Sequence, residues 1–132
     1  MSAAEWPVAA VRFARPTDRL DGVLRFYEEG LGLARIDSFA DHAGYSGVML
    51  GLPGEELHLE LTTHVDGSPG PAPTRDNLLV LYMTYRDAIV AIEGRMRALG
   101  HEPVEPENPY WEGDLTFEDP DGWRVVLRYV DS

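Results

Sequence analysis

A histidine and a glutamate stand two residues apart in a segment, 57–62, whose alternating leucines indicate a strand. Side chains two apart on a strand project from the same face, so His58 and Glu60 should lie next to each other. An imidazole and a carboxylate can ligate a divalent metal, and either can act as a general base. A metal site needs further convergent ligands, and the chain has no cysteine to supply one. The pair therefore predicts a polar patch rather than a complete metal centre. Alternatively, His58 has no chemical role and is a strand histidine whose ring is hydrogen-bonded within the fold.

Two aromatic residues, Tyr110 and Trp111, follow Pro109 in a predicted loop of the second half. An indole in such a loop can stack on a planar or cationic ligand. The same indole can instead pack down on its own domain as a plug. The sequence supports both interpretations of Trp111 equally.

The net charge of the chain limits the classes of partner that it can bind. With 11 basic and 23 acidic residues among 132, the formal net charge is −12. Such a surface repels the phosphates of nucleic acid, and there is no run of about 18 apolar residues to span a membrane. The acidic surface would suit a cationic ligand, although solubility alone explains it more simply. We expect a cytoplasmic protein that binds neither nucleic acid nor membrane.

Hydrophobic periodicity predicts a βαβββ order of elements in the first half. A helix begins near Leu20 and ends at Gly30 and Gly32. Turns at 44–47 and 53–54 separate the strands that follow it. The expected strands span 8–14, 34–40, 48–52 and 57–62.

The second half repeats this order after a linker rich in glycine and proline. Its helix ends at Gly100, and its expected strands span 78–83, 102–104, 114–118 and 123–130. We therefore predict one α+β domain over 1–132. It consists of a first module at 8–63, a surface linker at 64–75 and a second module at 76–131.

Three motifs, in this order, resemble the vicinal-oxygen-chelate superfamily, which includes glyoxalase I, extradiol dioxygenases and bleomycin-resistance proteins. Residues 25–33 (RFYEEGLGL) resemble the end of its first helix, and 59–61 (LEL) resemble its fourth strand. Residues 119–122 (DPDG) resemble the turn that closes its second module. Shorter segments at 14–17, 42–47, 57–60 and 108–111 resemble a bacterial glyoxalase-like branch with no known reaction. The resemblance implies two βαβββ modules in tandem, each curling a mixed sheet into a cup.

The resemblance also places four side chains where metal-dependent members hold histidine or glutamate. Counted from the helix and the turn, these positions are Arg12, Glu60, Asn77 and Val126. Only Glu60 is a good ligand, because a guanidinium has no lone pair to give, an amide oxygen is weak and valine has none. We therefore predict no bound metal and no cofactor.

The same resemblance implies a cup that binds a small molecule. Arg12 could clamp a carboxylate or phosphate oxygen, and Glu60 could accept from an ammonium or hydroxyl group. Alternatively, the two neutralise each other across the sheet. The predicted ligand-binding residues are Arg12, His58, Glu60, Asn77, Trp111 and Arg124, among the apolar Leu79, Leu81 and Val126.

Three functions remain open at this stage. The first is a metal-independent protein of the glyoxalase and bleomycin-resistance type that captures a small molecule, either cationic or bearing a carboxylate. The alternative is a lyase, isomerase or dioxygenase that uses Glu60 and His58, with or without a divalent metal. The third is a scaffold whose cavity is filled by side chains. Because the superfamily often pairs modules between chains, the resemblance also implies a homodimer.

Overall fold

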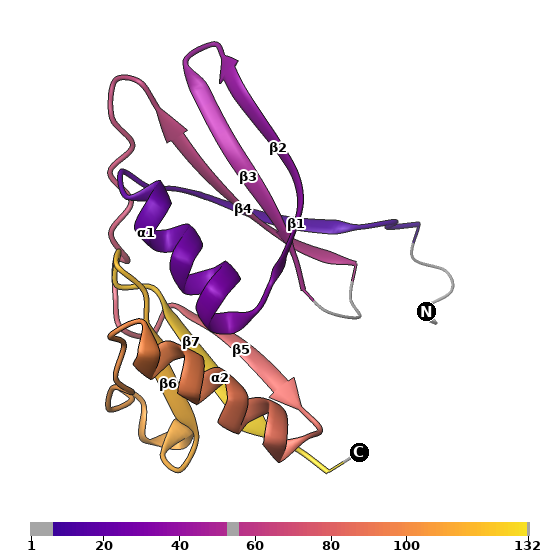
Figure 1. Cartoon of the computed structure of the whole chain (residues 1–132), viewed down its shortest axis with the longest axis vertical. Helices are drawn as coiled ribbons and strands as arrows, with labels where there is room; N and C mark the ends of the chain where they lie inside the picture. Colours follow the sequence, from indigo (N-terminus) through magenta and orange to yellow (C-terminus); the bar gives the residue numbers. More distant parts are fainter. Residues whose placement is uncertain (1–6, 53–55, 132) are drawn as a thin grey trace.

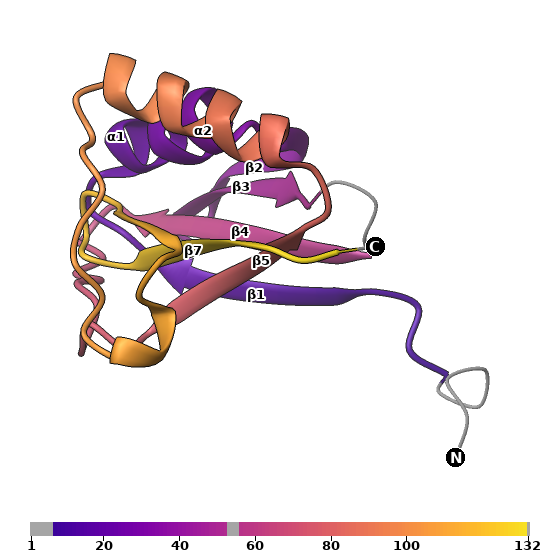
Figure 2. The same cartoon turned by 90° about the horizontal axis from the view of Figure 1, so that it is seen from below.

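Two β-sheets lie beneath two helices that cover the same side of the molecule (Figures 1 and 2). The computed structural model describes residues 7–52 and 56–131, so the predicted turn at 53–54 lies outside it. Within those ranges, no helix is long and apolar enough to cross a membrane. The mixed α+β fold predicted from the sequence is confirmed.

The first module has the predicted βαβββ order. Its sheet runs in the order β1-β4-β3-β2, with β1 parallel to β4 and the other pairs antiparallel. The helix α1 continues directly as a π-helical turn, η2, and ends where Gly32 takes a φ of 91°. The elements are β1 (Val11–Pro16), α1 (Leu20–Leu24), η2 (Arg25–Leu31), β2 (Ala34–His42), β3 (Tyr45–Gly51) and β4 (Leu57–His64).

The second module repeats this arrangement with a three-stranded sheet in the order β5-β7-β6. The strand expected at 102–104 is not formed. Only the Val104 amide donates to a β6 residue, the Thr116 carbonyl, at 2.8 Å. Pro103 and Pro106 have no N–H to extend that pairing. The elements are β5 (Leu78–Met83), α2 (Arg86–Ala98), η3 (Pro109–Trp111), β6 (Leu115–Glu118) and β7 (Arg124–Tyr129).

Strand alternation divides each sheet into a helix-facing side and an opposite side. In β4, Leu59 and Leu61 are buried in the core under the helices, so Glu60 projects from the other face. In the second sheet, Leu79 pairs with Val125 and packs on the helix side. Val126, one residue on, must face away. The expectation that Leu79, Leu81 and Val126 line one surface is therefore wrong.

The helices join the two modules at a glycine. A Cβ on Gly30 would lie 2.6 Å from the Met96 sulfur, so any other residue there would force the buried Met96 side chain to shift. Arg95 of α2 then donates from Nε to the Gly30 carbonyl at 3.0 Å, which satisfies an otherwise unpaired group at the end of η2.

The linker between the modules is fastened to both of them. The Ser68 amide donates to the Asp18 carboxylate, and the Ala72 amide donates to the Asp121 carbonyl at 2.9 Å. Ser68 is buried although it lies in the expected surface linker. These contacts tether the linker to the chain just after β1 and just before β7, and the candidate site is lined by residues of both strands.

Candidate functional site

The first group of predicted residues lies on the face of the first sheet that points away from the helices. Strands β1 and β4 pair Arg12 with His58 and Ala14 with Glu60, so these side chains share one face. Arg12 Nη1 lies 3.6 Å from Glu60 Oε1, with 48% of the Arg12 side chain and 13% of the Glu60 side chain exposed. The two charges neutralise each other loosely, as one of the two sequence interpretations expected.

A second group lines a cavity of about 260 Å³ between the two modules. His58, Asn77 and Arg124 all reach this intermodule cavity, whereas Arg12, Glu60 and Trp111 do not line it. The structure thus places three of the six predicted residues at the intermodule cavity and the other three outside it. The lining residues are Phe13, Arg15, Leu52, Leu57, His58, Leu59, Asn77, Leu78, Leu79, Trp123 and Arg124.

Two of the polar groups at the cavity keep donors unused. Asn77 Oδ1 accepts from the Thr74 amide at 3.1 Å and from the Thr74 hydroxyl at 2.7 Å, which leaves its Nδ2 to donate. Arg124 donates from Nε to Glu118 at 2.9 Å and from Nη1 to the Glu105 carbonyl at 2.9 Å. Its Nη2 has no partner within residues 7–52 and 56–131.

Trp111 packs over the second sheet, away from the intermodule cavity. Together with Thr116, Arg124 and Val126 it encloses a small space with no room for a water molecule. The Arg128 guanidinium carbon lies 4.6 Å from the Trp111 ring centroid and holds the indole down. Val126 and Thr116 are fully buried there. In this structure the indole therefore closes the second cup instead of opening it to a ligand.

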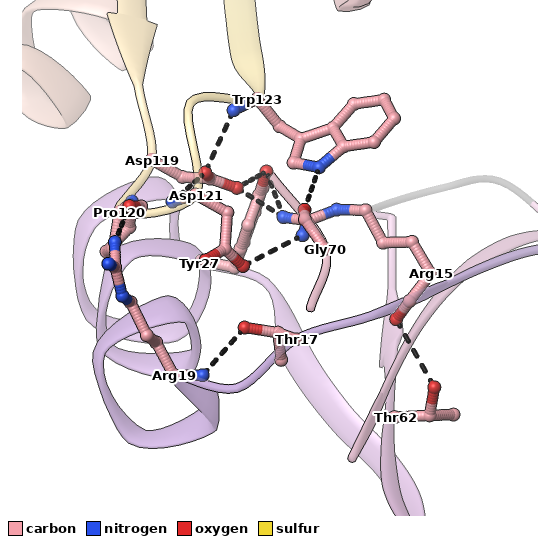
Figure 3. Close-up of polar contacts among 10 residues, drawn as sticks. All are labelled: Arg15, Thr17, Arg19, Tyr27, Thr62, Gly70, Asp119, Pro120, Asp121 and Trp123. Carbon is pink, nitrogen blue, oxygen red and sulfur yellow. Dashed lines mark hydrogen bonds and ion pairs between the residues drawn. The ribbon is translucent and has the colours of Figure 1, made fainter. Parts of the chain in front are cut away.

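The cavity wall is supported by a buried ionic network that nothing in the sequence indicated (Figure 3). Arg15 of β1 forms an ion pair with Asp119 of the Asp119–Gly122 turn, and both side chains are buried. Tyr27 donates to Asp119 Oδ2 at 2.8 Å and accepts from Arg15 Nη2 at 3.2 Å. Arg15 Nη1 also lies 3.4 Å from Asp121 Oδ2. Three chain segments, from both modules, thus meet at one carboxylate.

Burial sets the protonation of this network. Desolvation, reinforced by the Asp119 charge, raises the pKa of Tyr27 well above its usual value, so the phenol keeps its proton and donates it. Desolvation also raises the pKa of Asp119, while Arg15, Tyr27 and two backbone amides lower it. Those amides, from Asp121 and Trp123, donate to Asp119 Oδ1 at 2.8 and 3.0 Å.

The network fixes two side chains of the cavity. The Trp123 indole donates to the Gly70 carbonyl at 2.9 Å, and the Arg15 guanidinium carbon lies 5.2 Å from its ring centroid. Arg15, between Ala14 and Pro16 in β1, gave no signal of this role in the sequence. Its partner is 104 residues away, and only the fold brings the two together.

The donor set does not fit the metal ion of the superfamily's metal-dependent members. Among the described residues, no three histidine, aspartate or glutamate side chains come together. Glu60 has Arg12 for its neighbour, and a guanidinium repels a cation. Val126, at the last expected ligand position, is buried and has no donor atom.

A βαβββ module and a second module of the order βαββ, joined through their helices and a shared turn, define this chain as a member of the glyoxalase and bleomycin-resistance class of folds. Within that class the chain belongs to the YycE-like family. The family's N-terminal domain model matches residues 11–62, and its C-terminal domain model matches residues 76–129. The YycE protein of Bacillus subtilis (strain 168) is 49% identical over 125 residues, which cover 94% of this chain and 90% of that protein.

Solved structures agree with this assignment. A crystal structure of a YycE protein of unknown function from Bacillus subtilis has a TM-score of 0.87 over 94% of this chain and 91% of that one, at 49% identity. TnmS3, an antibiotic-binding protein from Streptomyces sp. CB03234, has a TM-score of 0.65 at 20% identity, over 94% of this chain and 98% of that one. Leishmania major glyoxalase I has a TM-score of 0.68 at 19% identity, over 92% and 86%. The last two show a shared fold.

Proposed function

We propose that this chain is a metal-independent, small-molecule-binding protein of the cytoplasm whose ligand occupies the intermodule cavity. The observation that supports this most is the character of that cavity, which is walled mainly by leucine and aromatic side chains with a few convergent polar groups. Small-molecule sites in proteins usually have this composition. His58, Asn77 and Arg124 are the predicted binding residues that would contact the ligand there.

The fold neighbours and the donor set support the same proposal. TnmS3 is an antibiotic-binding protein of this fold, so the architecture can hold a small molecule. The alternative of a metal-dependent lyase, isomerase or dioxygenase would need a third ligand beside His58 and Glu60. Among the residues described, no such ligand joins them.

We also propose that the binding unit is a homodimer. A groove of about 700 Å³, lined by apolar side chains of η2, β5 and α2, shares Leu52 and Leu57 with the intermodule cavity. Strand β1 is an unpaired edge of its sheet and exposes Val11 and Phe13. An apolar edge strand of this kind is suited to another copy of the chain, and natural proteins rarely leave one uncovered. A partner seated on the groove would also shield the cavity from water.

The dimer is tested with two matched substitutions. Val11 and Val90 are 52% and 64% exposed, but Val11 lies on the β1 edge and Val90 on the outer surface of α2. We expect Val11→Lys to convert the dimer to monomer in sedimentation velocity, and Val90→Lys to leave it unchanged. A wild-type monomer at high micromolar concentration would contradict the proposal.

Small-molecule capture is tested on protein treated with a chelator. A broad panel of cationic antibiotics, carboxylic acids and neutral aromatics is screened by thermal unfolding. We expect a subset to raise the melting temperature in the presence of the chelator, since a ligand at 100 times its Kd stabilises by about 2.7 kcal/mol. In parallel, protein equilibrated with Fe(II), Mn(II), Ni(II) or Zn(II) should retain no metal after gel filtration. Near-stoichiometric retention that is lost in Glu60→Ala would establish the metal enzyme instead.

A further inference from the structure

The polar groups at the intermodule cavity have one chemical property in common: each can donate a hydrogen bond. They are Arg15, His58, Asn77 and Arg124, and no aspartate or glutamate lines the cavity. The surrounding chain has a formal net charge of −12, so an interior free of carboxylates stands out. The cavity therefore differs in electrostatic character from the surface around it.

Two of these donors, Asn77 and Arg124, lie together on one wall. The Arg124 amide donates to the Asn77 carbonyl at 3.4 Å, so these two residues are neighbours across β5 and β7. Trp123 precedes Arg124 and stacks with Arg15 at 5.2 Å. The apolar Leu52 and Leu57 are shared with the groove and mark the opposite end. The cavity thus has the Asn77 and Arg124 donors on one wall, and mainly apolar side chains, beside His58, at the other end.

Each arginine has its carboxylate partners outside the cavity lining. Arg15 is bound by Asp119 and Asp121, and Arg124 is bound by Glu118. These contacts fix the guanidinium groups, while Arg124 Nη2 and Asn77 Nδ2 stay available. A ligand oxyanion would meet donors that are already in place, whereas a ligand ammonium would meet no acceptor of opposite charge and would be buried unpaired.

We propose that the cavity selects small organic oxyanions, namely a carboxylate joined to an apolar, planar or branched body. The oxyanion accepts from Asn77 Nδ2 and Arg124 Nη2, and the apolar body packs against Leu52, Leu57 and Phe13. This inference rests on the proposed function and narrows its ligand. It excludes the cationic ligands that the overall charge of the chain would suggest.

The test compares acids with isosteric neutral and cationic molecules. The probes are benzoate, benzamide and benzylamine, together with their homologues that are two carbons longer, and binding is measured by calorimetry. We expect the acids to bind at least tenfold more tightly than the amides, and the amines to give no detectable heat.

Two asparagine variants locate the effect. In Asn77→Asp, the new carboxylate keeps the oxygen that accepts from Thr74 and replaces the cavity donor with a charge that repels an anion. Asn108→Asp is the matched control, because its Oδ1 likewise accepts a backbone amide, from Tyr110 at 3.0 Å, and it does not line this cavity. Asn77→Asp should weaken acid binding more than tenfold and amide binding less than twofold. Asn108→Asp should change both less than twofold.

The possible outcomes distinguish a failure of the oxyanion selectivity from a failure of small-molecule binding itself. Tighter binding of amines or amides than of acids would overturn the oxyanion class and leave small-molecule capture intact. Equal weakening by both variants would place the anion outside the intermodule cavity and overturn the assignment. If the broad screen yields no ligand at all, the proposed function fails together with this inference.

Discussion

The buried Arg15–Asp119 pair makes a sharp prediction about stability. In Arg15→Gln the guanidinium is lost from Asp119, which stays buried with only the Tyr27 hydroxyl and two backbone amides as donors. Removing one partner of a buried ion pair costs about 3–5 kcal/mol, because the other charge is left uncompensated. Natural domains have about 5–15 kcal/mol of stability, so the variant should be folded but markedly weaker.

The pH dependence of that loss follows from the same contacts. Arg15 lowers the pKa of Asp119 against the effect of burial, so its removal must raise that pKa further in the folded variant. A carboxyl with a raised folded pKa gains stability as the pH falls, because the folded state then binds the proton that the unfolded state has not yet taken up. The difference in unfolding free energy between wild type and Arg15→Gln should therefore shrink between pH 7 and pH 4.5.

Urea unfolding followed by tryptophan fluorescence measures both effects, since Trp123 stacks on Arg15. The control is Arg12→Gln, which removes the same group from a partly exposed pair at 3.6 Å and should cost less than about 1 kcal/mol. The reasoning is refuted if the two variants lose similar stability at pH 7, or if the loss in Arg15→Gln is independent of pH.

Three further variants test the packing account. Tyr27 keeps its proton in the folded state but loses it in the unfolded state above about pH 10. The free energy of unfolding should therefore fall by about 1.4 kcal/mol per pH unit there, and Tyr27→Phe should reduce that fall in urea titrations. Gly30→Ala should lose about 1–3 kcal/mol in the same assay, because its methyl group would collide with Met96; an unchanged midpoint would contradict the close approach. Thr116→Val removes a buried hydroxyl with no partner among the described residues, so stability should hold or rise, and a clear loss would reveal a hidden partner.

The element order could be predicted because it depends on local signals. Alternating leucines, helical spacing and glycine turns predicted βαβββ units, and most observed strands lie within a few residues of the expected ones. The segment 102–104 is the exception. A strand was expected there to complete the second βαβββ unit, but two prolines limit its pairing to a single bond to β6.

The candidate site was only partly predictable, because it depends on contacts distant in sequence. The alternation of side chains along a strand predicted that His58 and Glu60 lie on one face, and the pairing of β1 with β4 agrees with this. It could not indicate that His58 also borders a cavity formed with Asn77 and Arg124 of the other module. Arg15 and Asp119 each fell within a family-like motif, at 14–17 and 119–122, but nothing in the sequence indicated that they pair, because a buried ion pair between distant segments exists only once the modules have docked.

The most direct test of the account is where a ligand binds in the absence of metal. Backbone amide shifts of the chelator-treated protein would be recorded during titration with the best ligand of the broad screen. We predict changes concentrated at residues 57–59, 77–79 and 123–124, the strand segments that line the intermodule cavity. Changes centred on Arg12 and Glu60 instead, or binding that appears only after metal is restored, would contradict the account.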